Sequence, residues 1–181
     1  MAESSDDLIR RYLEDAIAAE KSFETQLREF AAEGDDDEVQ SAFAFHADQT
    51  RRQYERLAAR LEQIGGALSN GKNSIAQLFA RASQVVQSGR VPEERTAHNL
   101  ISAFSIENGE CAMYEALACL ANAVGDAETE MLAREIQTEE RNTAEKLARF
   151  IPSRSKIAFN MLTVSEVDPA VETRAPDDRI V

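Results

Sequence analysis

Residues 100–124 read LISAFSIENGECAMYEALACLANAV, and this stretch decides the fold. Wound as a helix, it carries apolar residues on nearly every side, a pattern typical of a helix surrounded by other helices. Three carboxylates nevertheless lie inside it: Glu107, Glu110 and Glu115. No Lys or Arg occurs from Thr96 to Ala133 to neutralise them. Because a buried carboxylate must be protonated, paired across helices or bound to a cation, partners for these acids have to come from other parts of the chain.

The rest of the sequence predicts three more long helices. Ser and Asp residues before an apolar stripe are typical of helix starts, and single glycines after it are typical of helix ends. The predicted helices run from about Ser4 or Ser5 to Ala32, from the turn Asp35–Asp37 to about Ile64, from Pro92 to Val124 and from about Ala127 to Phe150. Short first and last connections make the joined helices antiparallel. The sequence thus predicts an all-α four-helix bundle, with a short extra helix in the crossover Gly65–Val91.

More ionisable side chains are predicted to face the interior of this bundle. Glu20 falls near the middle of the apolar stripe of the first helix, and His46 is central to the stripe of the second. On the fourth helix, Glu139 lies inside the apolar arc and Glu135 at its border, whereas Glu140 is expected to face solvent. A lone histidine on an apolar face is more often a core residue than a ligand. With Glu20 on the adjacent helix, both interpretations of His46 remain open.

The regular pattern stops at Ile151–Pro152, which divides the chain into a bundle of residues 1–151 and a C-terminal extension of residues 152–181. We expect Lys156–Val164 to pack on the bundle or on a neighbour, and the last residues to be mobile. Phe159 and nearby apolar residues in this extension favour a homodimer as the associated state.

The overall charge excludes some classes of partner. The formal net charge is −13, so nucleic acid and anionic membrane surfaces, which reward clustered Lys and Arg, are not expected partners. No apolar run approaches the ~20 residues of a transmembrane helix, and the acidic start lacks the layout of a signal peptide. Cys111 and Cys119 lie ~12 Å apart on one predicted helix, too far for a disulfide. These features predict a cytoplasmic protein with free thiols.

Four segments carry a resemblance to a known family: YLEDAIAAEKSFETQL, AFAFHADQTRRQYERL, IENGECAMYEALACLANAVG and LAREIQTEERNTAEKL. They resemble the four helices of the bacterial YciE/YciF-like ferritin-like proteins, and GALSNGKNSIAQLFARASQVV resembles the crossover helix of that family. The resemblance covers about residues 6 to 150 and rests on the order and spacing of the segments. It implies a dimeric ferritin-like four-helix bundle with a dinuclear metal site and stress-linked expression.

Carried over by position, the resemblance implies a ligand set for iron or manganese: Glu20, His46, Glu107, Glu110, Glu139 and Glu135. Two positions depart from the family pattern. Gln49 stands where the family usually has an acid, and Asn108 stands where it usually has a histidine. The Glu-x-x-His pairs of the wider di-iron class are also missing.

Two interpretations of function follow from this ligand set. In the first, the chain is a di-metal carboxylate protein of the ferritin-like class. Iron bridged by Glu107 and a carboxylate of the first or fourth helix would react with oxygen or peroxide. In the second, the chain is a metal-free helical stress or interaction protein. There, Glu20, His46 and the acids of the third helix form a buried polar network. The incomplete ligand pattern leaves both open.

Overall fold

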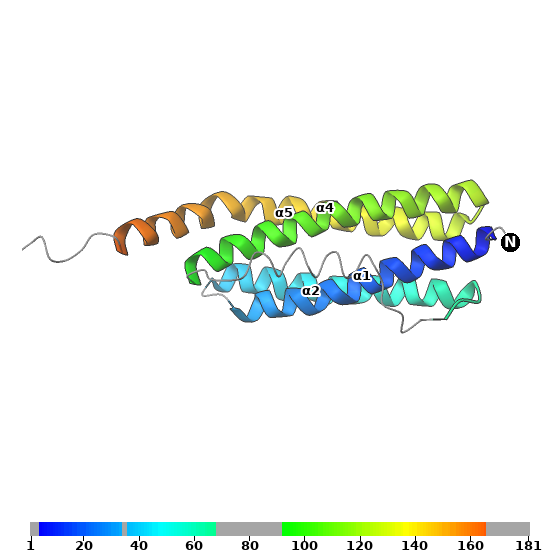
Figure 1. The fold of residues 1–181 in the computed structure, drawn as a ribbon, viewed down its shortest axis with the longest axis horizontal. Helices are drawn as coiled ribbons and strands as arrows, with labels where there is room; N and C mark the ends of the chain where they lie inside the picture. Colours follow the sequence, from blue (N-terminus) through cyan, green and yellow to red (C-terminus); the bar gives the residue numbers. More distant parts are fainter. Residues whose placement is uncertain (1–3, 34–35, 68–91, 166–181) are drawn as a thin grey trace, which may run out of the picture.

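The protein is an all-α four-helix bundle, as predicted. The structure, a computed structural model, describes residues 4–33, 36–67 and 92–165 (Figure 1). Its helices are α1 (Ser5–Glu33), α2 (Asp37–Gln63), α4 (Pro92–Val124) and α5 (Ala127–Ser165). The predicted crossover helix falls largely on residues 68–91, outside the described residues. Within the described ranges, no helix is both long and apolar enough to cross a membrane.

Two antiparallel hairpins, α1–α2 and α4–α5, make up the bundle (Figure 1). Each second helix begins at an aspartate that caps it. The Asp36 carboxylate accepts a bond of 3.1 Å from the Val39 amide, and Asp126 accepts one of 3.0 Å from the Thr129 amide. Gly125 ends α4 with a φ of +80°, a conformation that strains residues with a Cβ. These local signals explain why the predicted turns within the two hairpins lie close to the observed ones.

The interior consists of two apolar clusters. The first gathers side chains from the start of α1, the end of α2, the end of α4 and the start of α5, among them Leu13, Leu57, Leu117 and Ile136. The second gathers side chains from the opposite halves of the same helices, among them Phe23, Phe43, Leu100 and Leu147. In each described helix, buried polar residues lie between the positions of the two clusters, and on α2 His46 lies directly beside them, next to Ala47 of the second cluster. The clusters therefore enclose a polar layer midway along the bundle.

The fourth long helix does not end at Phe150, and that prediction was wrong. α5 continues through Pro152 to Ser165 and extends past the beginning of α4 (Figure 1). Proline interrupts a helix because it has no N–H to donate. Here Arg154, one half-turn later, pairs with the start of α2 through Asp36 at 2.7 Å and Glu38 at 2.7 Å. These ion pairs fasten α5 to the bundle beyond the proline, so the helix crosses the predicted boundary at residue 151.

Candidate metal centre

The polar layer is built from one or two ionisable side chains of each of the four described helices. Glu20 comes from α1, His46 from α2, Glu107 and Glu110 from α4, and Glu140 from α5, and all five are at most 2% exposed. Residues three apart on a helix share a face, which is why both α4 acids point inward. The structure thus brings together four of the predicted ligands, Glu20, His46, Glu107 and Glu110, and adds Glu140.

Three of these side chains converge closely. His46, Glu107 and Glu140 each offer a ligand atom, and these atoms all lie within 4.8 Å of one another. The Nε2 atom of His46 is 2.9 Å from Oε1 of Glu107, although the geometry is not that of a hydrogen bond. The ring of Phe23 packs edge-on against the imidazole, with the ring centroids 5.3 Å apart. Three helices therefore present nitrogen and oxygen donors to one point.

Most of the oxygen and nitrogen atoms in the layer that could bind a metal have no hydrogen-bond partner. Both carboxylate oxygens of Glu107, both of Glu110, one of Glu20 and both ring nitrogens of His46 are buried and unsatisfied. Among the described residues, no Lys or Arg forms an ion pair with any of these carboxylates or with Glu140. Buried polar atoms in native proteins are almost always satisfied, so this concentration of free lone pairs needs a proton or a cation.

Burial dominates the acid–base behaviour of the layer. It raises the pKa of Glu107 to about 8, and it raises the pKa values of Glu20, Glu110 and Glu140 well above the ordinary range. Neighbouring carboxylates raise the pKa values of Glu20, Glu110 and Glu140 further because like charges repel. Burial lowers the pKa of His46 to about 4, so its imidazole is neutral at pH 7. Neutral imidazole is the form that binds metals.

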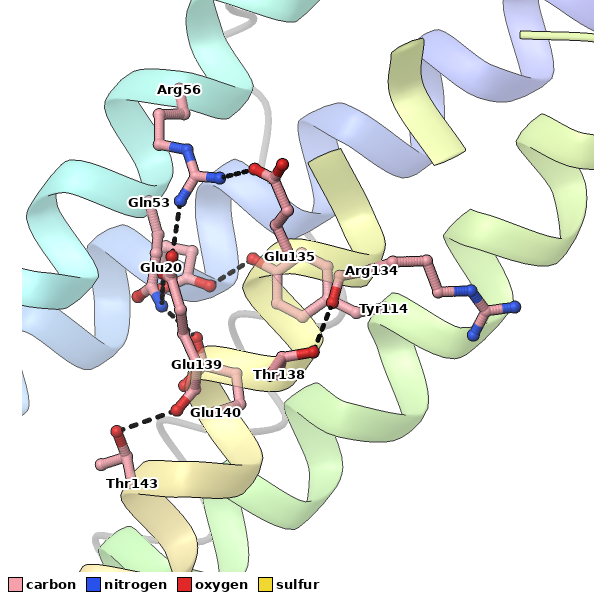
Figure 2. Close-up of polar contacts among 10 residues, drawn as sticks. All are labelled: Glu20, Gln53, Arg56, Tyr114, Arg134, Glu135, Thr138, Glu139, Glu140 and Thr143. Atoms are coloured by element: carbon pink, nitrogen blue, oxygen red, sulfur yellow. Dashed lines mark hydrogen bonds and ion pairs between the residues drawn. The ribbon is translucent and has the colours of Figure 1, made fainter. Parts of the chain in front are cut away.

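Two polar side chains orient the acids of the layer (Figure 2). The Tyr114 hydroxyl, fully buried, donates a hydrogen bond to Oε1 of Glu20. The Gln53 amide donates to Oε1 of Glu140 at 2.5 Å and to Oε2 of Glu139 at 2.9 Å. Such partners fix the rotamers of metal-ligating carboxylates in known sites.

The remaining two predicted ligands lie at the outer edge of the layer, where Arg56 holds both (Figure 2). Its guanidinium is 2.9 Å from Oε1 of Glu139 and 2.6 Å from Oε2 of Glu135. The Glu139 side chain is 37% exposed and that of Glu135 is 56% exposed. The structure does not bring either carboxylate into the group formed by His46, Glu107 and Glu140.

The prediction that Glu139 faces inward and Glu140 outward was therefore wrong. The buried stripe of α5 runs through Ala133, Ile136, Glu140, Ala144 and Leu147. The prediction from sequence included larger residues at the margins of the stripe, such as Leu132 and Phe150. Their inclusion rotated the predicted stripe by about one residue and placed Glu139 inside it. The two alanines, which need close helix contact to be buried, were the signal that places Glu140 at the centre.

The two departures from the expected family pattern lie outside this centre. Asn108 is exposed on α4, and its amide donates a 2.7 Å bond to the Phe104 carbonyl. Gln49 is half-buried between α2 and α5, one turn from His46. The buried set is thus four carboxylates and one imidazole, a donor set suited to iron or manganese. The unsatisfied donor atoms fit such an ion.

Comparison with known proteins identifies the family. The model of the family described as "Domain of unknown function (DUF892)" matches residues 4–159. Protein YciF of Escherichia coli (strain K12) is 28% identical over 144 residues, which cover 78% of this chain and 87% of that protein. The crystal structure of the E. coli stress protein YciF superimposes with a TM-score of 0.77 at 25% identity, covering 86% of this chain and 99% of the other.

More distant structures share the architecture. A bacterioferritin from Desulfovibrio desulfuricans, described with a diiron site, is 18% identical with a TM-score of 0.67 and covers 99% of this chain and 100% of the other. Ferritin-like, diiron-carboxylate proteins from Bacillus anthracis (strain Ames) give 15% identity and a TM-score of 0.63, covering 83% and 99% of the two chains. At these identities the likeness shows the fold alone. The chain is accordingly a ferritin-like four-helix bundle, and it belongs to the DUF892 family.

Proposed function

We propose that this protein binds divalent iron or manganese in the polar layer, as a dinuclear carboxylate centre. The single observation that carries the proposal is the set of buried, unsatisfied ligand atoms on α1, α2 and α4, which lie in one layer with the buried Glu140 of α5. We assign the ligands as Glu20, His46, Glu107, Glu110 and Glu140. Glu135 and Glu139, also expected from sequence, are assigned an outer role in holding Arg56 and Gln53.

The described residues prepare this layer in three ways. Tyr114 and Gln53 hold the carboxylates of Glu20 and Glu140 in fixed orientations. The apolar clusters above and below exclude bulk water, which strengthens every electrostatic interaction inside. The neutral imidazole of His46 leaves a lone pair free for an ion. A bound iron ion would supply redox chemistry with oxygen or peroxide. The E. coli relative is a stress protein, and we extend a role in oxidative stress to this chain.

A metal-free protein is the competing proposal, and one observation favours it. The pKa of Glu107 near 8 means that this carboxyl holds a proton at neutral pH when no cation is present. Protonated acids could donate hydrogen bonds to one another and form a neutral buried network. In that case the protein keeps the ferritin-like fold without redox chemistry and acts as a helical stress or interaction protein.

Metal titration separates these two proposals. Protein purified without chelator or added metal is first analysed for its elemental content and then titrated with Fe(II) and Mn(II). We expect tight binding by the native chain and its loss in Glu107→Gln. Glu115→Gln is the matched control, because Glu115 lies on the same helix but is half exposed and pairs with Arg134. A native protein that binds neither ion with a dissociation constant below about 1 mM would end the metal proposal.

We also propose that the protein is a cytoplasmic homodimer that uses the projecting end of α5. Ile157 and Phe159 are 52% and 65% exposed there. Exposed apolar side chains grouped on a projecting helix favour contact with a second copy. Light scattering is expected to give the mass of a dimer, and Phe159→Ser is expected to lower it toward that of a monomer. A native protein that stays monomeric at all micromolar concentrations would contradict this assignment.

A further inference from the structure

A groove runs along the seam between α2 and α5, on the outside of the polar layer. Its deeper part has a volume of about 480 Å³ and lies between Ala42, Phe45 and His46 on α2 and Leu147 and Phe150 on α5. A second hollow of about 370 Å³ continues past Gln49 and Thr143 toward Arg56. Cavities of this size commonly hold small organic ligands.

The charge of the groove is opposite to that of the protein. The chain as a whole carries −13, yet Arg52, Arg56, Lys146, Arg149 and Arg154 line the two hollows against only two acids, Glu38 and Glu139. Arg56 and Arg154 are neutralised by ion pairs. For Arg52, Lys146 and Arg149, no described carboxylate lies within ion-pair distance. Unpaired cations gathered in one groove of an acidic protein indicate an anionic ligand.

The deeper part also has apolar side chains in its walls. Phe45 is 61% exposed, although the adjacent His46 is buried. The Lys146 ammonium lies 6.0 Å from the centre of the Phe45 ring, so a cation and an aromatic face border the same space. Ala42 and Phe150 are half-buried, and Leu147 is buried. A ligand with an apolar body and one anionic group would cover the aromatic ring and neutralise the cation together.

His46 connects the groove with the polar layer. Its side chain is 3% exposed, lines the deeper hollow, and is also 2.9 Å from Glu107 in the candidate metal centre. We propose that the groove between α2 and α5 binds a small amphipathic organic anion, a carboxylate with an apolar body. The carboxylate lies at Lys146 and Arg149, and the apolar body lies against Phe45 and Leu147. This site goes beyond the proposed metal function and does not require it.

Calorimetric titration of the full-length, metal-free protein tests the site. The probe is phenylbutyrate, and phenylbutyramide is the neutral control of the same shape. We expect saturable binding of the acid and at least roughly threefold weaker binding of the amide, as for a partly exposed charge contact. The double variant Lys146→Gln/Arg149→Gln is expected to weaken binding of the acid roughly tenfold and to leave the amide unchanged.

Two further variants make the assignment specific to the groove. Arg141→Gln/Lys156→Gln removes the same charge from α5 outside the groove and should leave binding unchanged. Ala42→Phe fills the apolar part and should weaken binding of both probes by at least roughly tenfold. Circular dichroism confirms that each variant is folded, and the comparison of acid with amide needs no variant at all.

Several results would overturn the proposal. These are equal affinity for acid and amide, absence of saturable binding at millimolar probe, and equal binding by the groove and control variants. Sedimentation in the same solutions measures the oligomeric state and provides one more result that could overturn the proposal. A dimer that Ala42→Phe dissociates and that phenylbutyrate does not perturb would assign the groove to self-association instead. The titration uses metal-free protein, so its result does not depend on whether the polar layer binds metal. The two proposals can therefore fail separately.

Discussion

Glu110 and Glu115 lie on the same helix, little more than one turn apart, yet their surroundings are opposite. Glu110 is fully buried, no described Lys or Arg forms an ion pair with it, and burial raises its pKa well above the ordinary range. Glu115 is half exposed and pairs with Arg134, which lowers its pKa to about 2. The same contrast separates Glu140 from Glu139 on α5. Glu115 and Glu139 at the edge have arginine partners, whereas Glu110 and Glu140 in the centre have none among the described residues, and this difference distinguishes a structural ion pair from a candidate ligand.

The largest effect on metal affinity is expected when the central acid of α5, Glu140, is changed rather than its neighbour at the edge, Glu139. Glu140→Gln should lower Fe(II) or Mn(II) affinity by more than 100-fold, because it removes a direct ligand, and such a loss exceeds the ~10–100-fold typical of outer partners. Glu139→Gln should remain within that outer range, because Glu139 contacts Arg56 and Gln53 at the edge. Isothermal titration of both variants measures the difference. Equal losses would place both residues in the same role.

The next effect concerns the pH dependence of the metal-free protein. Folded Glu107 keeps its proton up to about pH 8, whereas an exposed glutamate loses it near pH ~4.3. Between these values the folded chain binds more protons than the unfolded chain, so the free energy of unfolding falls as pH rises. The native protein should therefore lose on the order of a few kcal/mol over this range relative to Glu107→Gln. Urea titrations from pH 5 to 8.5 measure this loss, and parallel curves for the two proteins would contradict it.

A smaller effect is expected from the residue that orients Glu20. Tyr114→Phe removes the buried hydroxyl that donates to Glu20 and keeps the ring in place. We expect a ~10-fold loss of metal affinity, the lower end for an outer partner. The metal-free protein should be destabilised by about 1 kcal/mol, as for a single hydrogen bond. Tyr54→Phe on α2 is a matched control, because Tyr54 is only half-buried and lies outside the polar layer.

The smallest effect is expected at the edge of the bundle. Glu115→Gln breaks the half-exposed pair with Arg134 and should leave the metal affinity unchanged within twofold. Raising the salt concentration should change the melting temperature of the native protein more than that of this variant, because salt screens exposed pairs. A loss of metal from this variant would show that the edge and the centre are not independent.

Much of this arrangement could be predicted from the sequence, because the signals are local. The acidic turns and glycines predicted the ends of α1, α2 and α4 and the start of α5 within a few residues, and the apolar surroundings of Glu107 and Glu110 predicted their burial. The depth of Glu20 in the bundle also follows from the periodicity of α1. Each of these features depends on residues within one segment of the chain, so it can be predicted without knowledge of the tertiary contacts.

Two features could not be predicted because they depend on distant contacts. The facing of Glu140 depends on which side of α5 is covered by neighbouring helices, and Leu132 and Phe150 at the margins suggested a slightly rotated stripe. The continuation of α5 past Pro152 depends on Arg154, which pairs with Asp36 across a sequence separation of 118 residues. Local rules predict that the helix ends at the proline. The residues around Pro152 do not indicate that Arg154 will pair with the start of α2.

The polar layer between the two apolar clusters has a further consequence for assembly. Long antiparallel helices with uniform apolar faces can slide by one turn, ~5.4 Å, and still bury most of their surface. In this protein such a shift would move Glu20 or Glu110 among the leucines and phenylalanines of a cluster, where an isolated carboxyl is strongly disfavoured. The acids thus select one alignment of the hairpins during folding. A variant with apolar residues at these positions would be expected to fold into several staggered bundles of similar energy.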